Sequence, residues 1–120
     1  MRVLVTGSRT WTDLIVIWDA LYEAYLIAPP GDSVIVIHGD CPRGADFIAD
    51  EVAREFGWST ERHPADWELY GKSAGFRRNI EMVKAGADIC LAFIRDNSRG
   101  ATHCADAAER AGIPIRRYHT

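Results

Sequence analysis

Short apolar runs rich in β-branched residues alternate along this chain with segments of helical periodicity, and this alternation constrains the fold most. The strand-like runs are Val3–Thr6, Ser33–Ile37, Ser59–His63, Asp88–Ile94 and Pro114–Tyr118. The second and fourth runs are almost continuously apolar, which is typical of strands covered on both faces. Successive β-α-β units require parallel strands joined by right-handed crossovers. The sequence therefore predicts one α/β domain over residues 1–120, a Rossmann-like, doubly wound, mainly parallel sheet of five strands with helices on both faces.

Apolar stripes at helical spacing place four helices between these strands. The stripes consist of Leu14, Trp18, Leu21 and Tyr25, then Ile48, Val52 and Phe56, then Phe76, Ile80 and Val83, and finally Cys104, Ala108 and Ala111. Gly57, Gly86 and Gly112 follow the last three stripes, where a left-handed residue commonly ends a helix. The segment Pro29-Pro30-Gly31 ends the first helix.

Charge and cysteine usage exclude several classes of protein. The chain has 14 Lys and Arg residues against 17 Asp and Glu residues, a net charge of −3, so nonspecific coating of nucleic acid or of an anionic membrane is not expected. Its three cysteines contain no CxxC pair and its four histidines are scattered, so neither disulfides, nor a metal, nor a cofactor is indicated. Because Gly7 interrupts any leader and no apolar run reaches about 18 residues, we expect a soluble, cytoplasmic protein.

The two edges of the predicted sheet differ in charge. The loops that lead from helices into strands contain no Lys or Arg, whereas the loops that follow the carboxyl ends of the strands are rich in them. Seven of the 14 cations lie at or near that second edge, namely Arg9, Arg43, Lys72, Arg77, Arg78, Arg95 and Arg99. Glycines and helix N-termini gather there too, and together these groups bind phosphate well. The sequence predicts a ligand that carries phosphate, although GxGxxG and GxxxxGK[ST] motifs are absent.

Several motifs, in order, resemble the small YspA-like branch of the SLOG superfamily. They are Val5-Thr6-Gly7-Ser8-Arg9, His38-Gly39 with Gly44-Ala45-Asp46, Pro64-Ala65-Asp66-Trp67 with Gly71-Lys72, Ala74-Gly75-Phe76-Arg77-Arg78-Asn79 leading into Met82, Gly86-Ala87-Asp88 and Ala92-Phe93. The superfamily includes the "lonely guy" phosphoribohydrolases and the single-stranded DNA loader DprA. The resemblance implies a nucleotide or a nucleotide-derived ligand at the carboxyl edge of the sheet.

The resemblance, together with the loops at this edge, suggests which residues contact that ligand. They are Gly7, Ser8, Arg9, Gly39, Arg43, Gly44, Asp46, Trp67, Lys72, Arg77, Arg78, Asn79, Arg99, Gly100 and Thr102. Asp46 would accept ribose hydroxyls or would simply be a favourable charge in the first turn of its helix. Trp67 would stack on a base or pack on its own loop. Arg78, four residues before Met82, matches an arginine that is catalytic in the phosphoribohydrolases, and the alternative is a surface charge on an amphipathic helix.

One segment departs from the phosphoribohydrolase pattern. Those enzymes carry a PGGxGT loop followed by a glutamate that acts on the glycosidic bond, but residues 95–102 here read RDNSRGAT. No glutamate follows until Glu109, and cleavage of an N-glycosidic bond needs a carboxylate. Asp46 and Asp106 are the remaining candidates, and neither stands in a matched motif.

Three functions stay open on this reading. The favoured one is a sensor or sequestering protein for an ADP-ribose-like molecule or a nucleoside phosphate. The alternatives are a nucleotide hydrolase that cleaves an N-glycosidic or phosphoester bond, with tentative roles for Arg78 and Asp46, and DprA-like binding of single-stranded DNA, which the negative charge disfavours. We also expect a homodimer or larger homo-oligomer, because the third and fourth helices offer small or apolar positions. These are Ala74, Gly75, Met82, Ala101, Ala105 and Ala108.

Overall fold

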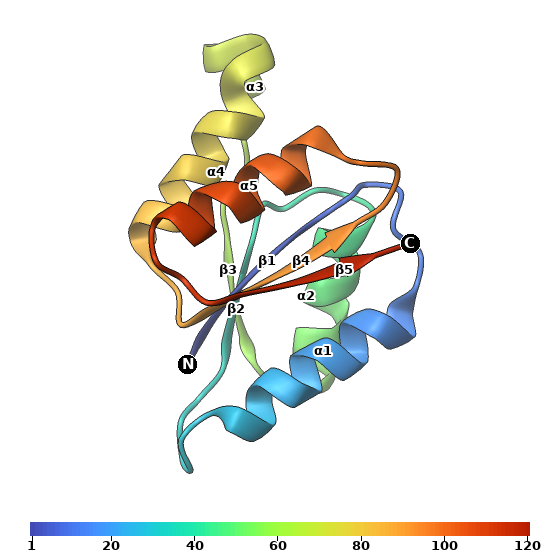
Figure 1. Cartoon of the computed structure of the whole chain (residues 1–120), viewed down its shortest axis with the longest axis vertical. Coiled ribbons are helices and arrows are strands. Elements are labelled where there is room, and N and C mark those ends of the chain that lie inside the picture. The colour runs from blue at the N-terminus through green and yellow to red at the C-terminus, as the bar shows by residue number, and fades with distance from the viewer.

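The computed structural model describes all residues from 1 to 120 and contains five parallel strands with helices between them (Figure 1). In chain order the elements are β1 (Arg2–Gly7), α1 (Leu14–Ile27), β2 (Ile35–His38), α2 (Ala45–Glu55), β3 (Ser59–Arg62), α3 (Trp67–Tyr70), η1 (Gly71–Ser73), α4 (Ala74–Ala85), β4 (Ile89–Ile94), α5 (Arg99–Arg110) and β5 (Ile115–His119). The strand order is β3-β2-β1-β4-β5, and every pairing is parallel. This confirms the predicted fold class, and no strand boundary differs by more than two residues.

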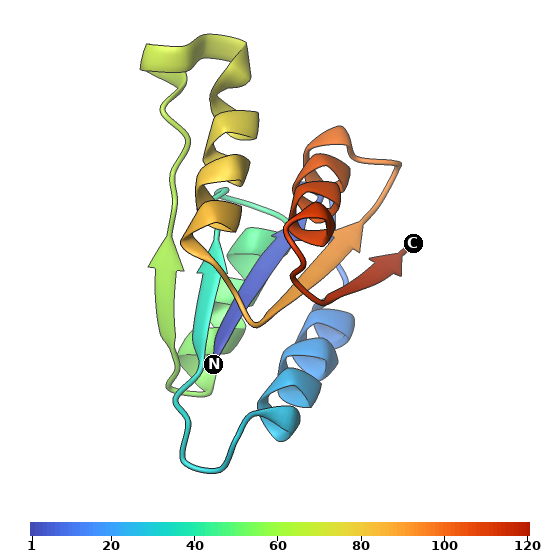
Figure 2. The ribbon, with the colours of Figure 1, turned by 60° about the vertical axis from the view of Figure 1, so that its left-hand side comes forward.

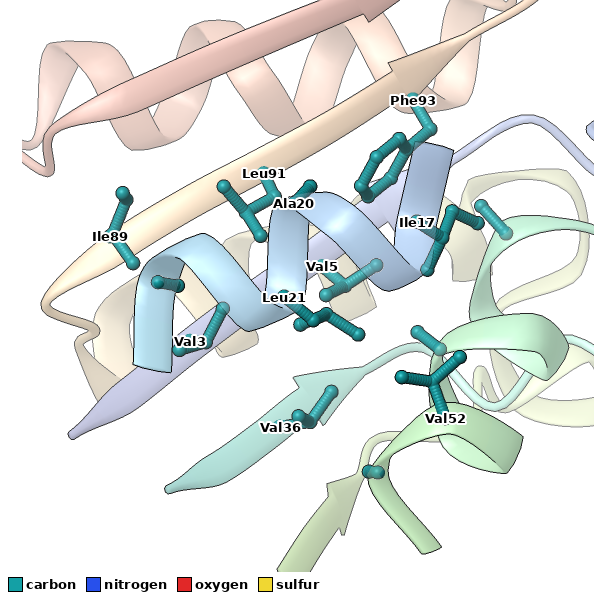
Figure 3. Packing of buried hydrophobic residues seen from close by; sticks show 14 of the residues in the cluster. Val3, Val5, Ile17, Ala20, Leu21, Val36, Val52, Ile89, Leu91 and Phe93 are labelled. Atoms are coloured by element: carbon teal, nitrogen blue, oxygen red, sulfur yellow. The ribbon is translucent and has the colours of Figure 1, made fainter. Parts of the chain in front are cut away.

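Helices cover both faces of the sheet. Figures 1 and 2 show α1 and α2 on one side and α4 and α5 on the other, while α3 stands at one end of the molecule. The larger apolar cluster, seen close by in Figure 3, packs α1 and α2 on β1, β2 and β4. The smaller clusters pack α4 and α5 on the opposite face. Since β4 lies between both layers, all six of its residues are buried.

The helix ends follow the local chemistry of the sequence. Asp13 caps α1 by accepting a hydrogen bond from the Val16 N–H, and α1 ends two residues before Pro29. Gly57, Gly86 and Gly112 all have positive φ angles of 73° to 88° after their helices, as predicted. These residues fix the loops that lead from helices into strands, which contain no Lys or Arg.

The predicted buried faces of three helices are partly wrong. In α1 the buried residues are Ile17, Ala20, Leu21 and Ala24, so that of the expected stripe only Leu21 is buried. The small alanines let the backbone of α1 approach the sheet, and this turns the large residues Leu14 and Tyr25 outward. In α4, likewise, Phe76 and Ile80 are exposed. In α5, Ala111 lies beyond the last turn and is exposed.

The small residues expected at a subunit interface lie inside this chain instead. Of the six, Gly75 is half-buried. Ala74, Met82, Ala101, Ala105 and Ala108 are all buried, because α4 packs directly on α5 and both pack on the sheet. They cannot also contact a second subunit, so the expected location of the interface is wrong.

None of the helices combines the length and the apolar character needed to cross a lipid bilayer.

Candidate functional site

A cavity of about 520 Å³ opens at the carboxyl ends of the strands, where the sheet changes its direction of winding between β1 and β4. Loops after β1, β2 and β4 and the segment from α3 to α4 form its walls. Ligands of α/β sheets bind at such switch points, and this volume lies within the range of small-molecule sites. The cavity is therefore the candidate site.

Most of the predicted contact residues meet in this cavity. Ten of them line it, namely Gly7, Ser8, Arg9, Arg43, Asp46, Trp67, Lys72, Arg78, Asn79 and Gly100. Five lie outside the lining, namely Gly39, Gly44, Arg77, Arg99 and Thr102. Gly44 still shapes the site, because it precedes α2 with φ +77° and a side chain there would collide with the backbone of Ser8 and Arg9.

The cavity is positively charged although the chain as a whole is negative. Its five cations are Arg9, Arg43, Lys72, Arg78 and Arg95, and its only acids are Asp46 and Asp96. Arg95 has a carboxylate partner, with 3.7 Å between its Nε and Asp96 Oδ2. The other four cations form no ion pair with any carboxylate of the chain. Unpaired cations around a concave surface favour an anionic ligand.

Ser8 joins the loops after β1 and β4. Its hydroxyl donates to the Arg95 carbonyl at 3.0 Å and accepts from the Arg95 N–H at 2.8 Å. The Ser8 carbonyl accepts from the N–H groups of Trp11 and Ala45, and Ser8 is almost fully buried. Because its only hydroxyl proton is already donated, Ser8 positions the wall of the cavity, and its hydroxyl is not a free donor.

Asp46 holds the loop after β2. Its Oδ2 accepts hydrogen bonds from the N–H groups of Gly39 at 3.1 Å and Cys41 at 3.4 Å. Burial raises the pKa of Asp46, and the hydrogen bonds from Cys41 and the nearby Arg78 guanidinium oppose this rise only in part. The residue stands in the first turn of α2, as predicted, and its carboxyl group fixes the loop at the cavity.

Arg78 is a half-buried connector and not a surface charge. Its Nη1 donates to the carbonyls of Gly39 and His63, and its Nε donates to Asn79 Oδ1 at 2.9 Å. Its Nη2 donates to no group of the chain and lies near Gly75, which lines the cavity. Arg78 therefore ties three segments together and has donors left for a ligand.

Arg77 points elsewhere, although it is the next residue in sequence. Its Nε donates to Ser73 Oγ at 3.1 Å, and its guanidinium lies 4.5 Å from the centre of the Tyr70 ring. Successive residues of a helix diverge by about 100°. Of the two arginines, only Arg78 reaches the cavity.

An aromatic and apolar wall faces these charges. It consists of Trp67, Phe76 and Met82, and the Trp67 side chain is about half exposed. A side-chain carbon at Gly75 would come within 3.3 Å of the Trp67 ring, so Trp67 rests on the glycine backbone. The Arg9 guanidinium lies 5.6 Å from the centre of the same ring. The cavity thus offers a planar apolar surface beside its cations.

Sequence reasoning missed part of the lining. The additional residues are Thr6, Thr10, Cys41, Gly75, Phe76, Met82, Arg95, Asp96, Ser98 and Ala101. Arg95 is one of the predicted cations of this edge, although the predicted contact residues omit it, and its position directly after β4 is a usable signal. Phe76 carries none, because its apolar character and spacing predict a place in the buried face of α4.

A buried histidine, His38, holds the loop after β2 that borders the site. The Asp40 N–H donates to His38 Nδ1 at 3.0 Å, so the proton of the neutral ring is on Nε2 and is donated to Asp50 Oδ1 at 2.7 Å. Asp50 also accepts from Arg54 and Arg62. Burial alone would raise the pKa of Asp50, but the hydrogen bonds from Arg62, His38 and Arg54 outweigh it and hold that pKa well below its usual range. Both ring nitrogens of His38 are engaged, so this network is structural.

No group of three or more His, Cys, Asp or Glu side chains is placed to hold a metal ion.

Comparison with known proteins gives two matches. The profile of the family described as "YspA, cpYpsA-related SLOG family" matches residues 1–70. The Gene 61 protein of Mycobacterium phage D29 is 51% identical over 119 residues, which cover 95% of this chain and 93% of that protein. No solved structure matches significantly.

Proposed function

Because this chain belongs to the YspA, cpYpsA-related SLOG family, we propose that it binds a nucleotide or a nucleotide-derived ligand in the cavity at the carboxyl edge of its sheet. Membership of the family suggests a role related to nucleotides. Within that role, we propose a sensor or sequestering protein for an ADP-ribose-like molecule or a nucleoside phosphate.

One observation carries the proposal, namely the four unpaired cations that surround the cavity. Three of them, Arg9, Arg43 and Lys72, are exposed and have no carboxylate partner, so they stabilise the fold little and their position at a concave site is better explained by a ligand. Arginine binds phosphate oxygens through two parallel N–H groups, and each charged hydrogen bond contributes about 1.5–3 kcal/mol. Phosphate groups of the ligand would lie among Arg9, Arg43 and Lys72.

The apolar wall supports the other half of the proposal. A nucleobase is flat, and stacking on an aromatic side chain contributes about 1–3 kcal/mol per base. Trp67 and Phe76 offer such surfaces within the same cavity as the cations. A ligand with a base at one end and phosphate at the other would use both.

Hydrolysis of a nucleotide is the second candidate, and Asp46 is the observation that favours it. Burial raises the pKa of Asp46, as general acids require, and the residue lines the cavity. Its Oδ2, however, already accepts two backbone hydrogen bonds. Asp96, the other carboxylate of the cavity, is mostly exposed and faces Arg95. Binding without chemistry is therefore the better supported function.

The experiment begins with native mass spectrometry of the freshly purified protein, to identify any retained nucleotide. Calorimetric titration with ADP-ribose, AMP and ADP follows, on the wild type and on two matched variants. Arg43→Ala removes an exposed, unpaired cation from the cavity, whereas Arg77→Ala removes an exposed cation outside it. We expect the dissociation constant to rise about 10-fold or more for Arg43→Ala, and to stay unchanged for Arg77→Ala.

Four results would count against the proposal. Equal losses in both variants would indicate a general charge effect, and no binding of any of these nucleotides would remove the proposed ligand class. If chromatography of the titration mixture detects free base or phosphate released from the nucleotide, that result would instead favour the hydrolase. Nanomolar binding of single-stranded DNA at physiological salt would favour the third function, since we expect only weak and strongly salt-dependent binding.

A further inference from the structure

Helix α1 has a second apolar face that this chain leaves uncovered. Ile17, Ala20 and Leu21 face the sheet (Figure 3), and Ala24 is buried with them. Large apolar side chains on another side of the helix are 43% to 65% exposed, namely Leu14, Ile15, Tyr22, Tyr25 and Leu26. At about 100° per residue these five positions fall within one stripe about 120° wide. The exposed residues are therefore neighbours on one surface.

Aromatic rings extend this surface beyond α1. Trp18 lies 4.5 Å from Phe56, Tyr22 lies 6.0 Å from Phe56, and these are distances between ring centres. Tyr25 lies 5.5 Å from Trp58, which stacks on Phe56 at 4.4 Å. Packed rings hold one another in place, so little conformational entropy is lost when a partner covers them.

The charges beside this face exclude several partners. Helix α1 contains no Lys or Arg, and its only charged residues are Asp19 and Glu23, at the rim of the apolar stripe. The one cation paired with them is Arg116 of β5, which lies 3.5 Å from Glu23, so the rim has no surplus of positive charge. Nucleic acid and anionic membranes both require cations at the contact. The partner must therefore present an uncharged, apolar protein surface.

We propose that α1 packs against α1 of a second copy of this chain and forms a two-fold symmetric dimer. From the exposed fractions, the five stripe residues present about 500 Å² of apolar surface. A standard interface buries about 800 Å² on each partner, and in homodimers about 65% of that area is apolar. The surface of α1 supplies this share, and a two-fold axis matches the apolar stripe with an identical one.

This dimer leaves the proposed ligand site accessible. The cavity is lined by loops at the carboxyl edge, by α3, η1 and α4, and by the first turns of α2 and α5, and no residue of α1 contributes to it. Helix α1 covers the face of the sheet opposite α4 and α5 (Figure 1). Assembly and ligand binding are therefore separate properties, and a dimer-breaking variant should bind ligand as the wild type does.

Light scattering coupled to size exclusion tests the proposal. We expect the wild type to have twice the 13.4 kDa mass of one chain, and Ile15→Glu combined with Leu26→Glu to have the mass of one chain. The control is Leu69→Glu, which places the same charge on α3 at a position 67% exposed, and it should remain a dimer. Circular dichroism and a thermal melt verify folding, and the single variant Ile15→Glu replaces the double one if that melt is abnormal.

Two outcomes would overturn the proposal. A wild-type mass near 13.4 kDa across micromolar concentrations would mean that α1 stays uncovered. A dimer that survives the α1 variants but is lost in Leu69→Glu would place the interface on α3.

Discussion

Asp50→Asn should destabilise the protein by about 2 kcal/mol at pH 7, with almost no change in shape. The oxygen of the substituted amide can still accept from His38 Nε2, but a bond to a charged acceptor is about twice as strong as a neutral one, so about 1 kcal/mol is lost there. The new amide nitrogen cannot accept from Arg54 or Arg62. These arginine side chains are 59% and 47% exposed, so each lost pair costs only about 0.5 kcal/mol.

The pKa of Asp50 determines how the loss of stability in Asp50→Asn changes with pH. The pKa of Asp50 in the folded protein lies below the value of about 3.9 expected in the unfolded chain. Its contribution to stability is therefore complete above about pH 5, and it declines as the pH falls through 3.9 toward the folded pKa, because the unfolded state takes up the proton first. The difference between wild type and Asp50→Asn should narrow below about pH 4.

Urea unfolding at several pH values measures this difference, and Glu51→Gln is the matched control. Glu51 is the next residue of α2 and contacts the same Arg54 at 3.3 Å, but its side chain is 51% exposed, so its loss should cost less than about 0.5 kcal/mol. A difference between wild type and Asp50→Asn that is equally large at pH 7 and pH 3.5 would refute the electrostatic explanation. A cost at pH 7 no greater than that of the control would refute the assigned magnitude.

Two further substitutions test the packing around the cavity. Gly7→Ala should lower the free energy of unfolding by about 1–3 kcal/mol, because the added carbon collides with Ala45 at the start of α2. Gly100→Ala should leave the free energy of unfolding unchanged, because the space around Gly100 is open. Equal urea midpoints for the two variants would contradict this packing. Arg78→Ala should lower the free energy of unfolding by about 1–3 kcal/mol, since it leaves the Gly39 carbonyl without its guanidinium donor. A thermal melt identical to that of the wild type would show that the hydrogen bonds of Arg78 do not stabilise the fold.

The architecture could be predicted because it depends on local chemistry. A glycine at the end of a helix, such as Gly86 with its positive φ, acts within a few residues, and a continuously apolar run such as β4 needs cover on both faces wherever it lies. The orientation of α1 depends on something else. Ala20 and Ala24 bring it close to the sheet while the larger residues turn outward, and this follows from the distance between two layers. The periodicity of apolar residues does not predict the distance between a helix and the sheet.

The location of the site could be predicted from the sequence, but the side chains that line it could be predicted only in part. Strand ends and loop composition locate the basic edge, because the carboxyl ends of parallel strands meet there. Which of two adjacent arginines enters the cavity depends on the rotation of α4. The sequence also leaves a surface charge open as the alternative for Arg78, because its acceptors lie in the distant loops at Gly39 and His63. Such long-range backbone acceptors leave no pattern in the sequence.

The central position of β1 has a consequence for how this chain can be divided. Its residues pair on one side with β2, close in sequence, and on the other with β4, where Val3 lies opposite Ile89. The middle of the sheet therefore closes only after β4, which ends at residue 94 of 120, has been synthesised, and pairing between segments so distant in sequence slows folding. A fragment ending at residue 70, where the family match ends, would lack β4 and leave Val3 and Val5 on an open strand edge. Such an edge recruits other chains, so truncation there yields an aggregating peptide and not a minimal ligand-binding domain.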